Sequence, residues 1–221
     1  MSTPQSPGHT LRLLPDSADS RLFVELSSYT ADLVEASTSL DLAIRSLVDS
    51  GPLADATGFL IGYAAMAYCR TYFPSKVRRP MTDHVSIPAQ HDDVHALITD
   101  YRNRRVAHSQ SQLSSTFAMI ALDADGSPRP GVFGFTTSQV LPREVLDEWA
   151  ELIATLTDRL DELLNEVQAR LNAVVAGTDR EVVRRWPAGP AISAQFSTDF
   201  TARDSRSQYP VTWTEFWSRA D

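Results

Sequence analysis

The sequence is poor in the features that several large classes of protein require. Its 221 residues include a single cysteine, Cys69, so no disulfide can form within the chain and cysteine-rich zinc sites are excluded. The nine glycines form no glycine-rich phosphate loop, and no GxSxG elbow or Rossmann fingerprint is present. No run approaches the roughly 20 apolar residues of a membrane span. We therefore expect a protein of the reducing cytoplasm that has no membrane partner.

Positive charge is also scarce, because 28 acidic residues outnumber 20 basic ones and give a formal net charge of −8. Such a chain does not coat nucleic acid through a general positive field, so any contact with RNA must be local. The basic residues are unevenly placed, with a cluster between positions 70 and 105. This clustering predicts a basic cleft on an acidic body, and ordinary solvated charges are the alternative.

The length and composition predict one globular domain with appendages, since 43% of the residues are hydrophobic and 22% are charged. Residues 1–19 are rich in Ser, Thr and Pro near their start, lack the apolar stretch of a signal peptide and are predicted to be extended or disordered. Residues 20–177 are predicted to form the domain. Residues 178–221, with three tryptophans, are predicted to be an irregular tail that docks on its own domain or binds a protein partner.

Apolar residues that recur in steps of three and four predict a mostly α-helical bundle with about four principal helices. Two segments rich in β-branched and aromatic residues, 116–122 and 132–137, predict a β-hairpin between the third and fourth helices. The proline-rich stretch 74–88 has no sustained period and is predicted to be a loop. The four helices are expected over about residues 22–47, 54–73, 89–101 and 142–177.

The densest chemistry lies at the end of the third predicted helix, in the sequence YRNRRVAH from Tyr101 to His108. An imidazole can transfer a proton near neutral pH, whereas an arginine keeps its charge and offers a planar fork to phosphate oxygens. The combination suits the cleavage of a phosphodiester without a metal. The alternative is a charged helix end that His108 caps through a backbone carbonyl.

The order Arg102-Asn103, two more arginines, an aliphatic residue, alanine and His108 resembles the motif of the HEPN superfamily, which comprises small helical bundles. The order of the predicted elements is similar over roughly residues 22–174. The resemblance implies a homodimer whose two motifs face each other across a cleft. It also implies a metal-independent endoribonuclease that needs no cofactor, used in stress or phage defence. A non-catalytic module that dimerises or binds RNA or protein is the alternative.

The resemblance further implies a role for each motif residue. Arg102 would neutralise the scissile phosphate, Asn103 would orient a phosphate oxygen or the imidazole, and His108 would act as general base or general acid. The ribose 2′-hydroxyl would be the nucleophile. The products would then carry 2′,3′-cyclic phosphate and 5′-hydroxyl ends, and DNA would not be cut.

Several neighbouring residues are expected to bind the RNA, with Tyr68 stacking on a base. The alternatives are that Tyr68 packs in the core and that Arg70 pairs with an acid. Residues six apart on an ideal helix are rotated by about 120° from one another. Either the helix loosens before His108, or Arg104 takes part of the role of Arg102. The expected substrate-binding residues are Tyr68, Arg70, Arg104 and Arg105.

His91 and His95 have the i, i+4 spacing of a metal pair, and the sequence around them resembles HExxH with Asp92 in place of the glutamate. Aspartate is one methylene shorter and would not reach a metal-bound water in the same way. No clear third ligand follows on this segment. Exposed histidines near a helix start are therefore the favoured interpretation, and no metal is expected.

Overall fold

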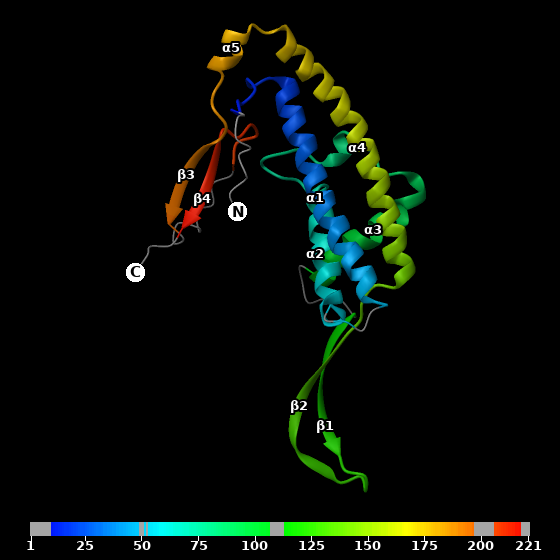
Figure 1. Cartoon of the computed structure of the whole chain (residues 1–221). Coiled ribbons are helices and arrows are strands. Elements are labelled where there is room, and N and C mark those ends of the chain that lie inside the picture. The colour runs from blue at the N-terminus through cyan, green and yellow to red at the C-terminus, as the bar shows by residue number, and fades with distance from the viewer. Residues whose placement is uncertain (1–9, 49–50, 52, 107–112, 197–205, 218–221) are drawn as a thin grey trace. The chain divides into compact units, whose positions relative to one another are not determined.

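The structure, a computed structural model, describes residues 10–48, 51, 53–106, 113–196 and 206–217 (Figure 1). The described residues contain five α-helices and two small sheets, so the predicted mostly helical class is confirmed. No described helix combines the length and the apolar character that crossing a membrane requires. The chain divides into two compact units, here called unit 1 (1–28, 74–80 and 160–221) and unit 2 (29–73 and 81–159).

Unit 2 is built around α2 (Thr57–Arg70), which the 3-10 turn η1 (Ala54–Ala56) precedes. Small side chains let neighbouring segments approach α2 closely, so it is buried on more than one side. Gly62 is an example, because a Cβ at this position would lie 3.7 Å from a methyl group of Val106. The buried residues of α2 are Thr57, Ile61, Ala64, Ala65, Ala67, Tyr68 and Cys69.

Two long helices supply apolar stripes to the core of unit 2. They are α1 (Ala18–Ser46) and α4 (Arg143–Gly177), and both contribute residues to each unit. Trp149 of α4 is fully buried, and its ring meets the Tyr68 ring edge to face at a centroid distance of 5.7 Å. The stripe residues of unit 2 recur in steps of three and four, as predicted: Tyr29, Leu33, Ala36, Leu40, Ala43, Leu146, Trp149, Leu152, Ile153 and Leu156.

The third helix is shorter than predicted and changes its winding near its end. α3 (Asp92–Tyr101) follows the 3-10 turn η3 (Ala89–His91) and buries Val94, Ile98 and Tyr101. It continues into η4 (Arg102–Val106), a π-helical turn. In a π-helix the hydrogen bonds join residues five apart, so the turn is wider than that of an α-helix. The basic motif therefore lies on a widened helical turn.

The connection between α2 and α3 matches the predicted loop over most of its length. Its one regular piece among the described residues of 74–88 is the 3-10 turn η2 (Met81–Asp83). The backbone N–H of Met81 donates to the carbonyl of Thr71 at 2.7 Å, and the Met81 side chain is buried. These contacts fix the end of the loop against the end of α2.

β1 (Ser114–Leu122) and β2 (Pro128–Ser138) form an antiparallel hairpin between α3 and α4. Its placement differs from the prediction, because β2 begins inside the stretch 123–131 that was expected to be loop. Gly126, at φ +85°, donates its N–H to the carbonyl of Asp123 at 2.9 Å, so the chain reverses early. The hairpin extends away from the helices of unit 2 (Figure 1), and every residue of β2 is exposed.

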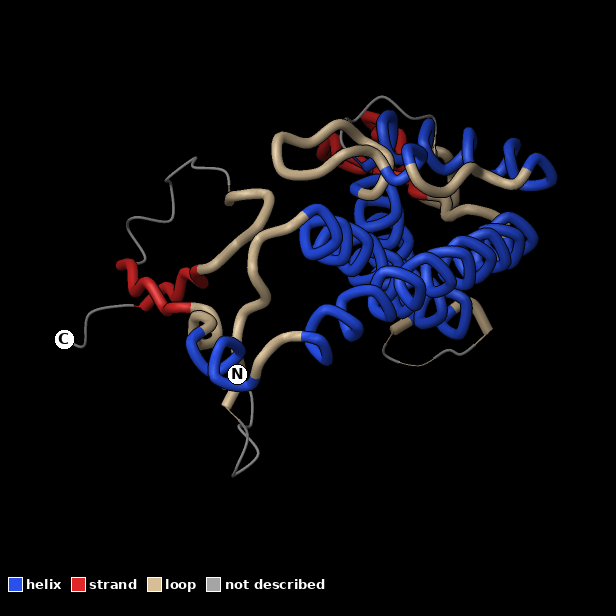
Figure 2. The backbone as a smooth tube through the Cα atoms, turned by 90° about the horizontal axis from the view of Figure 1, so that it is seen from above, coloured by secondary structure: helices blue, strands red, loops and turns tan. Residues whose placement is uncertain are grey.

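Unit 1 contains elements that the sequence did not predict. The segment 178–221, expected to be irregular, includes α5 (Arg180–Arg185) and a parallel pair of strands, β3 (Ala191–Phe196) and β4 (Thr212–Trp217). Figure 2 shows that the strands of the described chain are confined to this pair and the hairpin. Strands of six residues without a buried alternating face leave a weak pattern, which explains the missed prediction.

The close approach of α2 and η4 leads to a stability prediction. Replacing Gly62 by alanine removes the entropic cost of a glycine inside a helix, and the new Cβ meets Val106 at an ordinary contact distance. We expect Gly62→Ala to raise the free energy of unfolding by about 0.5–1 kcal/mol in a chemical denaturation experiment. Gly62→Leu should lower it, because the larger side chain must displace Val106. Destabilisation by Gly62→Ala of more than about 1 kcal/mol would contradict this packing.

Candidate functional site

The motif segment adopts the loosened geometry that was one of the two alternatives drawn from the sequence. Arg102–Val106 forms the π turn η4, and its five residues include the three arginines of the motif. A wider turn changes which side chains share a face, so the spacing expected on an ideal α-helix no longer applies. His108, the predicted general base or acid, lies in the stretch 107–112, outside the described residues.

Arg102 and Asn103, both partly buried, contact each other at the start of η4. A guanidinium nitrogen of Arg102 donates to the Asn103 side-chain oxygen at 2.9 Å. The guanidinium carbon lies 4.6 Å from the centre of the Phe73 ring, a cation–π contact. Burial raises the pKa of the neighbouring Cys69 thiol to about 11, and the positive charge of Arg102 opposes that rise. These contacts hold the planar fork of Arg102 in one orientation.

Arg105 lies at the other end of the same turn. One of its terminal nitrogens donates to the hydroxyl of Ser138, at the end of β2, at 2.8 Å. The Nε–H groups of Arg102 and Arg105 are both buried and have no hydrogen-bond partner within the described part of the chain. Neither arginine forms an ion pair with a carboxylate of those residues. Their charge is therefore not balanced locally.

A groove, here called the motif groove, runs beside η4 with a cavity volume of about 600 Å³. α2 contributes Gly58, Phe59, Gly62 and Tyr63 to its lining, and η4 contributes Arg105 and Val106. Phe59 is 81% exposed and Tyr63 is 50% exposed. Three aromatic residues, Phe59, Tyr63 and the buried Tyr101, thus line the groove together with one guanidinium, of Arg105, and one carboxylate, of Asp55. Arg102 is not among its lining residues.

Phe59 and Tyr63 were missed by the sequence analysis. They are four residues apart on α2 and therefore lie on one face of the helix. The helix is apolar on most sides in the sequence, so the pattern alone does not reveal which aromatic residues remain exposed. Only the packing of neighbouring segments on α2 shows that Phe59 and Tyr63 are exposed whereas Ile61 and Tyr68 are buried.

The predicted substrate-binding residues Arg104 and Arg70 bind carboxylates of the protein itself. Arg104, exposed, pairs with Asp100 one turn earlier at 2.7 Å. Arg70 pairs with Asp32 of α1 at 2.7 Å and also with Glu35. Pairing of Arg70 with an acid was the alternative drawn from the sequence. Both side chains keep some exposure, but a phosphate would have to compete with these acids.

Tyr68 is fully buried, as in the core-packing alternative. Its hydroxyl lies 2.8 Å from Nδ1 of His95, and its ring contacts those of Tyr72, His95 and Trp149. Burial raises the pKa of Tyr68, so its hydroxyl stays protonated and shares a hydrogen bond with Nδ1 of His95. In this arrangement no ring face of Tyr68 is open to a base. The exposed rings of the motif groove are better placed for stacking.

The sequence analysis favoured exposed positions for the two histidines considered as a metal pair, and this prediction is wrong. His91 is buried at the start of α3, and His95 is bound through Nδ1 to Tyr68. Burial lowers the pKa of His95, whereas the nearby Asp92 opposes that shift. Within the described ranges, no group of three or more His, Cys, Asp or Glu side chains could hold a metal ion. His95 instead serves the packing of α3 against α2.

Comparison of the chain with protein-family models, with curated proteins and with solved structures gives no match. Function is therefore inferred from the residues and their geometry, together with the resemblance of the motif.

The buried pair of Tyr68 and His95 leads to a pH prediction. Because the folded-state pKa of His95 is lowered, the unfolded chain takes up this proton first as the pH falls. The contribution of neutral His95 to stability is therefore complete above its unfolded pKa of about 6.5 and is lost as the pH falls towards the folded value. We expect the free energy of unfolding to fall as the pH is lowered below about 6.5, and to fall less steeply in His95→Gln.

Chemical denaturation at a series of pH values measures this difference. His84→Gln is the matched control, because it removes one imidazole of unit 2 and leaves His95 in place. An equal slope in wild type and His95→Gln would show that His95 does not carry the effect.

Proposed function

We propose that the protein is a HEPN-like, metal-independent endoribonuclease that cleaves RNA by attack of the ribose 2′-hydroxyl. The observation that carries the proposal is the charge of Arg102 and Arg105, which lie on the motif turn, are partly buried and have no carboxylate partner in the described ranges. A desolvated guanidinium is stabilised by an anion, and the planar fork of arginine matches phosphate oxygens. A phosphodiester supplies that anion.

Arg102 is the phosphate-binding residue in this proposal. Its contacts with Phe73 and Asn103 hold the guanidinium in place before substrate binds. Preorganised charge of this kind stabilises a phosphorane-like transition state without the cost of reorganising the side chain. Asn103 positions Arg102 and orients a phosphate oxygen.

His108 carries the proton transfers. As general base it takes the proton of the 2′-hydroxyl, whose oxygen attacks phosphorus and displaces the 5′-oxygen of the next nucleotide. The leaving oxygen receives a proton from a general acid. In a homodimer with facing motifs, the same histidine of a second copy supplies that proton. The protein acts in this scheme as a cytoplasmic RNase of stress or phage defence.

The motif groove binds the RNA next to the cleaved bond. Phe59 and Tyr63 present exposed aromatic faces, on which unpaired bases stack with little dependence on sequence. Arg105, which also lines the groove, neutralises a neighbouring phosphate. This division of contacts favours single-stranded RNA over a duplex, because bases in a duplex are already stacked on each other.

A non-catalytic module that dimerises or binds RNA or protein is the second candidate. The pairing of Arg70 and Arg104 with acids favours it, because fewer arginines of the predicted basic cleft remain for a substrate than the sequence suggested. The two candidates differ in whether bound RNA is cut.

Cleavage of a structured RNA in the presence of EDTA tests the proposed chemistry. We expect wild-type protein to cut the RNA with the chelator present, and His108→Ala to lose the activity while still binding RNA. Binding by both proteins without cleavage would favour the non-catalytic module. Loss of wild-type activity in EDTA would contradict a metal-independent mechanism.

A comparison of arginine variants tests the assignment of Arg102. We expect Arg102→Ala to reduce the cleavage rate by about 100-fold or more, since a preorganised charge on the phosphate is removed. Arg104→Ala should cause a much smaller loss, because its guanidinium is already engaged by Asp100. Arg143→Ala, which breaks a similar exposed i, i+4 pair with Asp147, is the matched control. A larger loss in Arg104→Ala than in Arg102→Ala would transfer the role to Arg104.

A further inference from the structure

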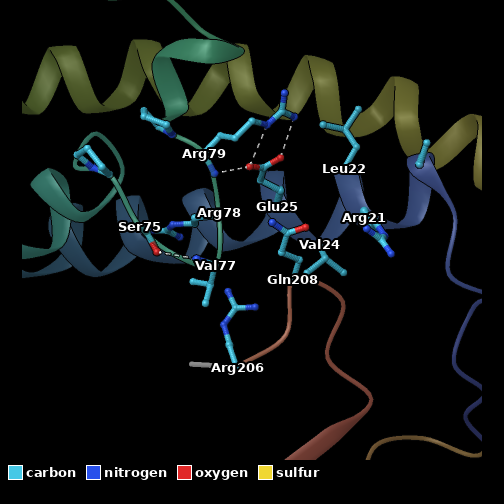
Figure 3. A pocket seen from close by; sticks show the side chains of 13 residues that line it. Arg21, Leu22, Val24, Glu25, Ser75, Val77, Arg78, Arg79, Arg206 and Gln208 are labelled. Carbon is cyan, nitrogen blue, oxygen red and sulfur yellow. Dashed lines mark hydrogen bonds and ion pairs between the residues drawn. The ribbon is translucent and has the colours of Figure 1, made fainter. Parts of the chain in front are cut away.

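Unit 1 contains a second cavity, of about 670 Å³, that neither the motif nor the motif groove involves. It is lined by three segments far apart in the sequence: the first turns of α1, the loop 74–80, and the stretch around 206–208 (Figure 3). This volume is within the range of small-molecule sites in proteins, about 300–1,000 Å³. We call it the arginine cavity, after the residues that line it.

The charge of the arginine cavity is opposite to that of the whole chain. Four arginines line it, Arg21, Arg78, Arg79 and Arg206, together with the carboxylate of Glu25. Arg21 pairs with Asp16 at 2.6 Å and Arg79 pairs with Glu25 at 3.0 Å. The positive charge of the lining beyond these two pairs is that of Arg78 and Arg206. The chain as a whole carries a net charge of −8. A concave site with positive walls concentrates the field, so an anion repelled by the rest of the surface is attracted here.

The arginines are held by contacts that fix their orientation. Glu25 accepts hydrogen bonds from the backbone N–H of Arg79 at 2.7 Å and from its guanidinium at 3.0 Å (Figure 3). Arg78 donates to the hydroxyl of Ser28 at 2.9 Å. A guanidinium that is already oriented loses less conformational entropy when it binds an anion. These two residues therefore form the fixed wall of the cavity.

Arg206 is the residue best suited to hold the ligand directly. Its side chain reaches from the C-terminal segment towards Val77 on the loop (Figure 3). Within the part of the chain that the structure describes, its one hydrogen bond is a 3.4 Å contact with the carbonyl of Ser207, and it has no carboxylate partner. The segment is anchored nearby, because the hydroxyl of Tyr209 donates to the carbonyl of Leu14 at 2.6 Å.

The rest of the lining is apolar and suits the uncharged part of a ligand. Leu22 and Val24 of α1 and Val77 of the loop contribute side chains without polar atoms. A bare inorganic anion would leave this surface in contact with water. A phosphate ester that carries a ring would bury it.

We propose that the arginine cavity binds a small organic phosphate of the size of a nucleoside monophosphate. The phosphate is held between Arg206 and Arg78, and the ring contacts Val77 and Leu22. Two guanidiniums from different segments of the chain match a dianionic phosphate better than a monoanionic carboxylate. Tyr209 is a positioning residue for Arg206. This site is independent of the proposed ribonuclease activity.

Titration calorimetry of the full-length protein with AMP, GMP, CMP and UMP tests the site, with inorganic phosphate and adenosine as partial ligands. We expect at least one nucleotide to bind more tightly than both partial ligands. Arg206→Glu should weaken that binding by about tenfold or more, since it replaces attraction by repulsion. Tyr209→Phe should weaken it less. Arg45→Ala, an exposed arginine paired with Asp41 and remote in sequence from the lining residues, is the matched control.

Three outcomes would overturn the inference. The first is the absence of binding by any of the four nucleotides at millimolar concentration. The second is binding that Arg206→Glu and the control Arg45→Ala leave equally strong. The third is that a ten-nucleotide RNA binds more tightly than any mononucleotide and that Arg206→Glu abolishes this RNA binding. That result would make the cavity part of an RNA-binding surface. Circular dichroism of each variant shows whether a loss of binding reflects unfolding.

Discussion

The packing of Val106 against Gly62 is the constraint on which the candidate site depends. A small residue at position 62 of α2 leaves room for the turn η4, with the Val106 methyl groups 3.7 and 3.8 Å from the position a Cβ would occupy. This approach fixes η4 at the point where the winding of the third helix changes. Gly62 and Val106 both line the motif groove, so the same contact shapes it.

The distribution of acids decides which arginines remain available for an anion. α1 supplies Asp32 and Glu35 to Arg70, and α3 supplies Asp100 to Arg104. The motif turn itself contains no acid, so Arg102 and Arg105 contact an amide, a hydroxyl and an aromatic face among the described residues. On a chain with a net charge of −8, this local lack of carboxylates separates a positive site from the acidic background.

Helices α1 to α4 could be predicted from the sequence because each buries recurrent apolar residues, whereas α5, which buries none, was missed. The apolar stripe of α4 gave bounds within one residue of those observed, since Pro142 and Gly177 mark its ends. The start of β2 was missed because the reversal at Gly126 is earlier than the composition of the loop suggests. The pairing of β3 with β4 depends on contacts distant in sequence, which no local pattern records.

The candidate site was predictable in its motif and less so in its surroundings. The run of arginines identified the turn, but the burial of Tyr68 and the exposure of Phe59 follow from which neighbours pack on α2. The arginine cavity could not be predicted, because it unites Arg206 with residues more than a hundred positions earlier.

The nature of the nucleophile is the central claim of this account. It is tested most directly by replacing the nucleotide on the 5′ side of the cleaved bond with its 2′-deoxy form in an otherwise unchanged RNA. Attack by the ribose hydroxyl predicts that cleavage at that bond stops, while other bonds are still cut to 2′,3′-cyclic phosphate ends. Continued cleavage at the deoxy position, with a 5′-phosphate on the product, would contradict it.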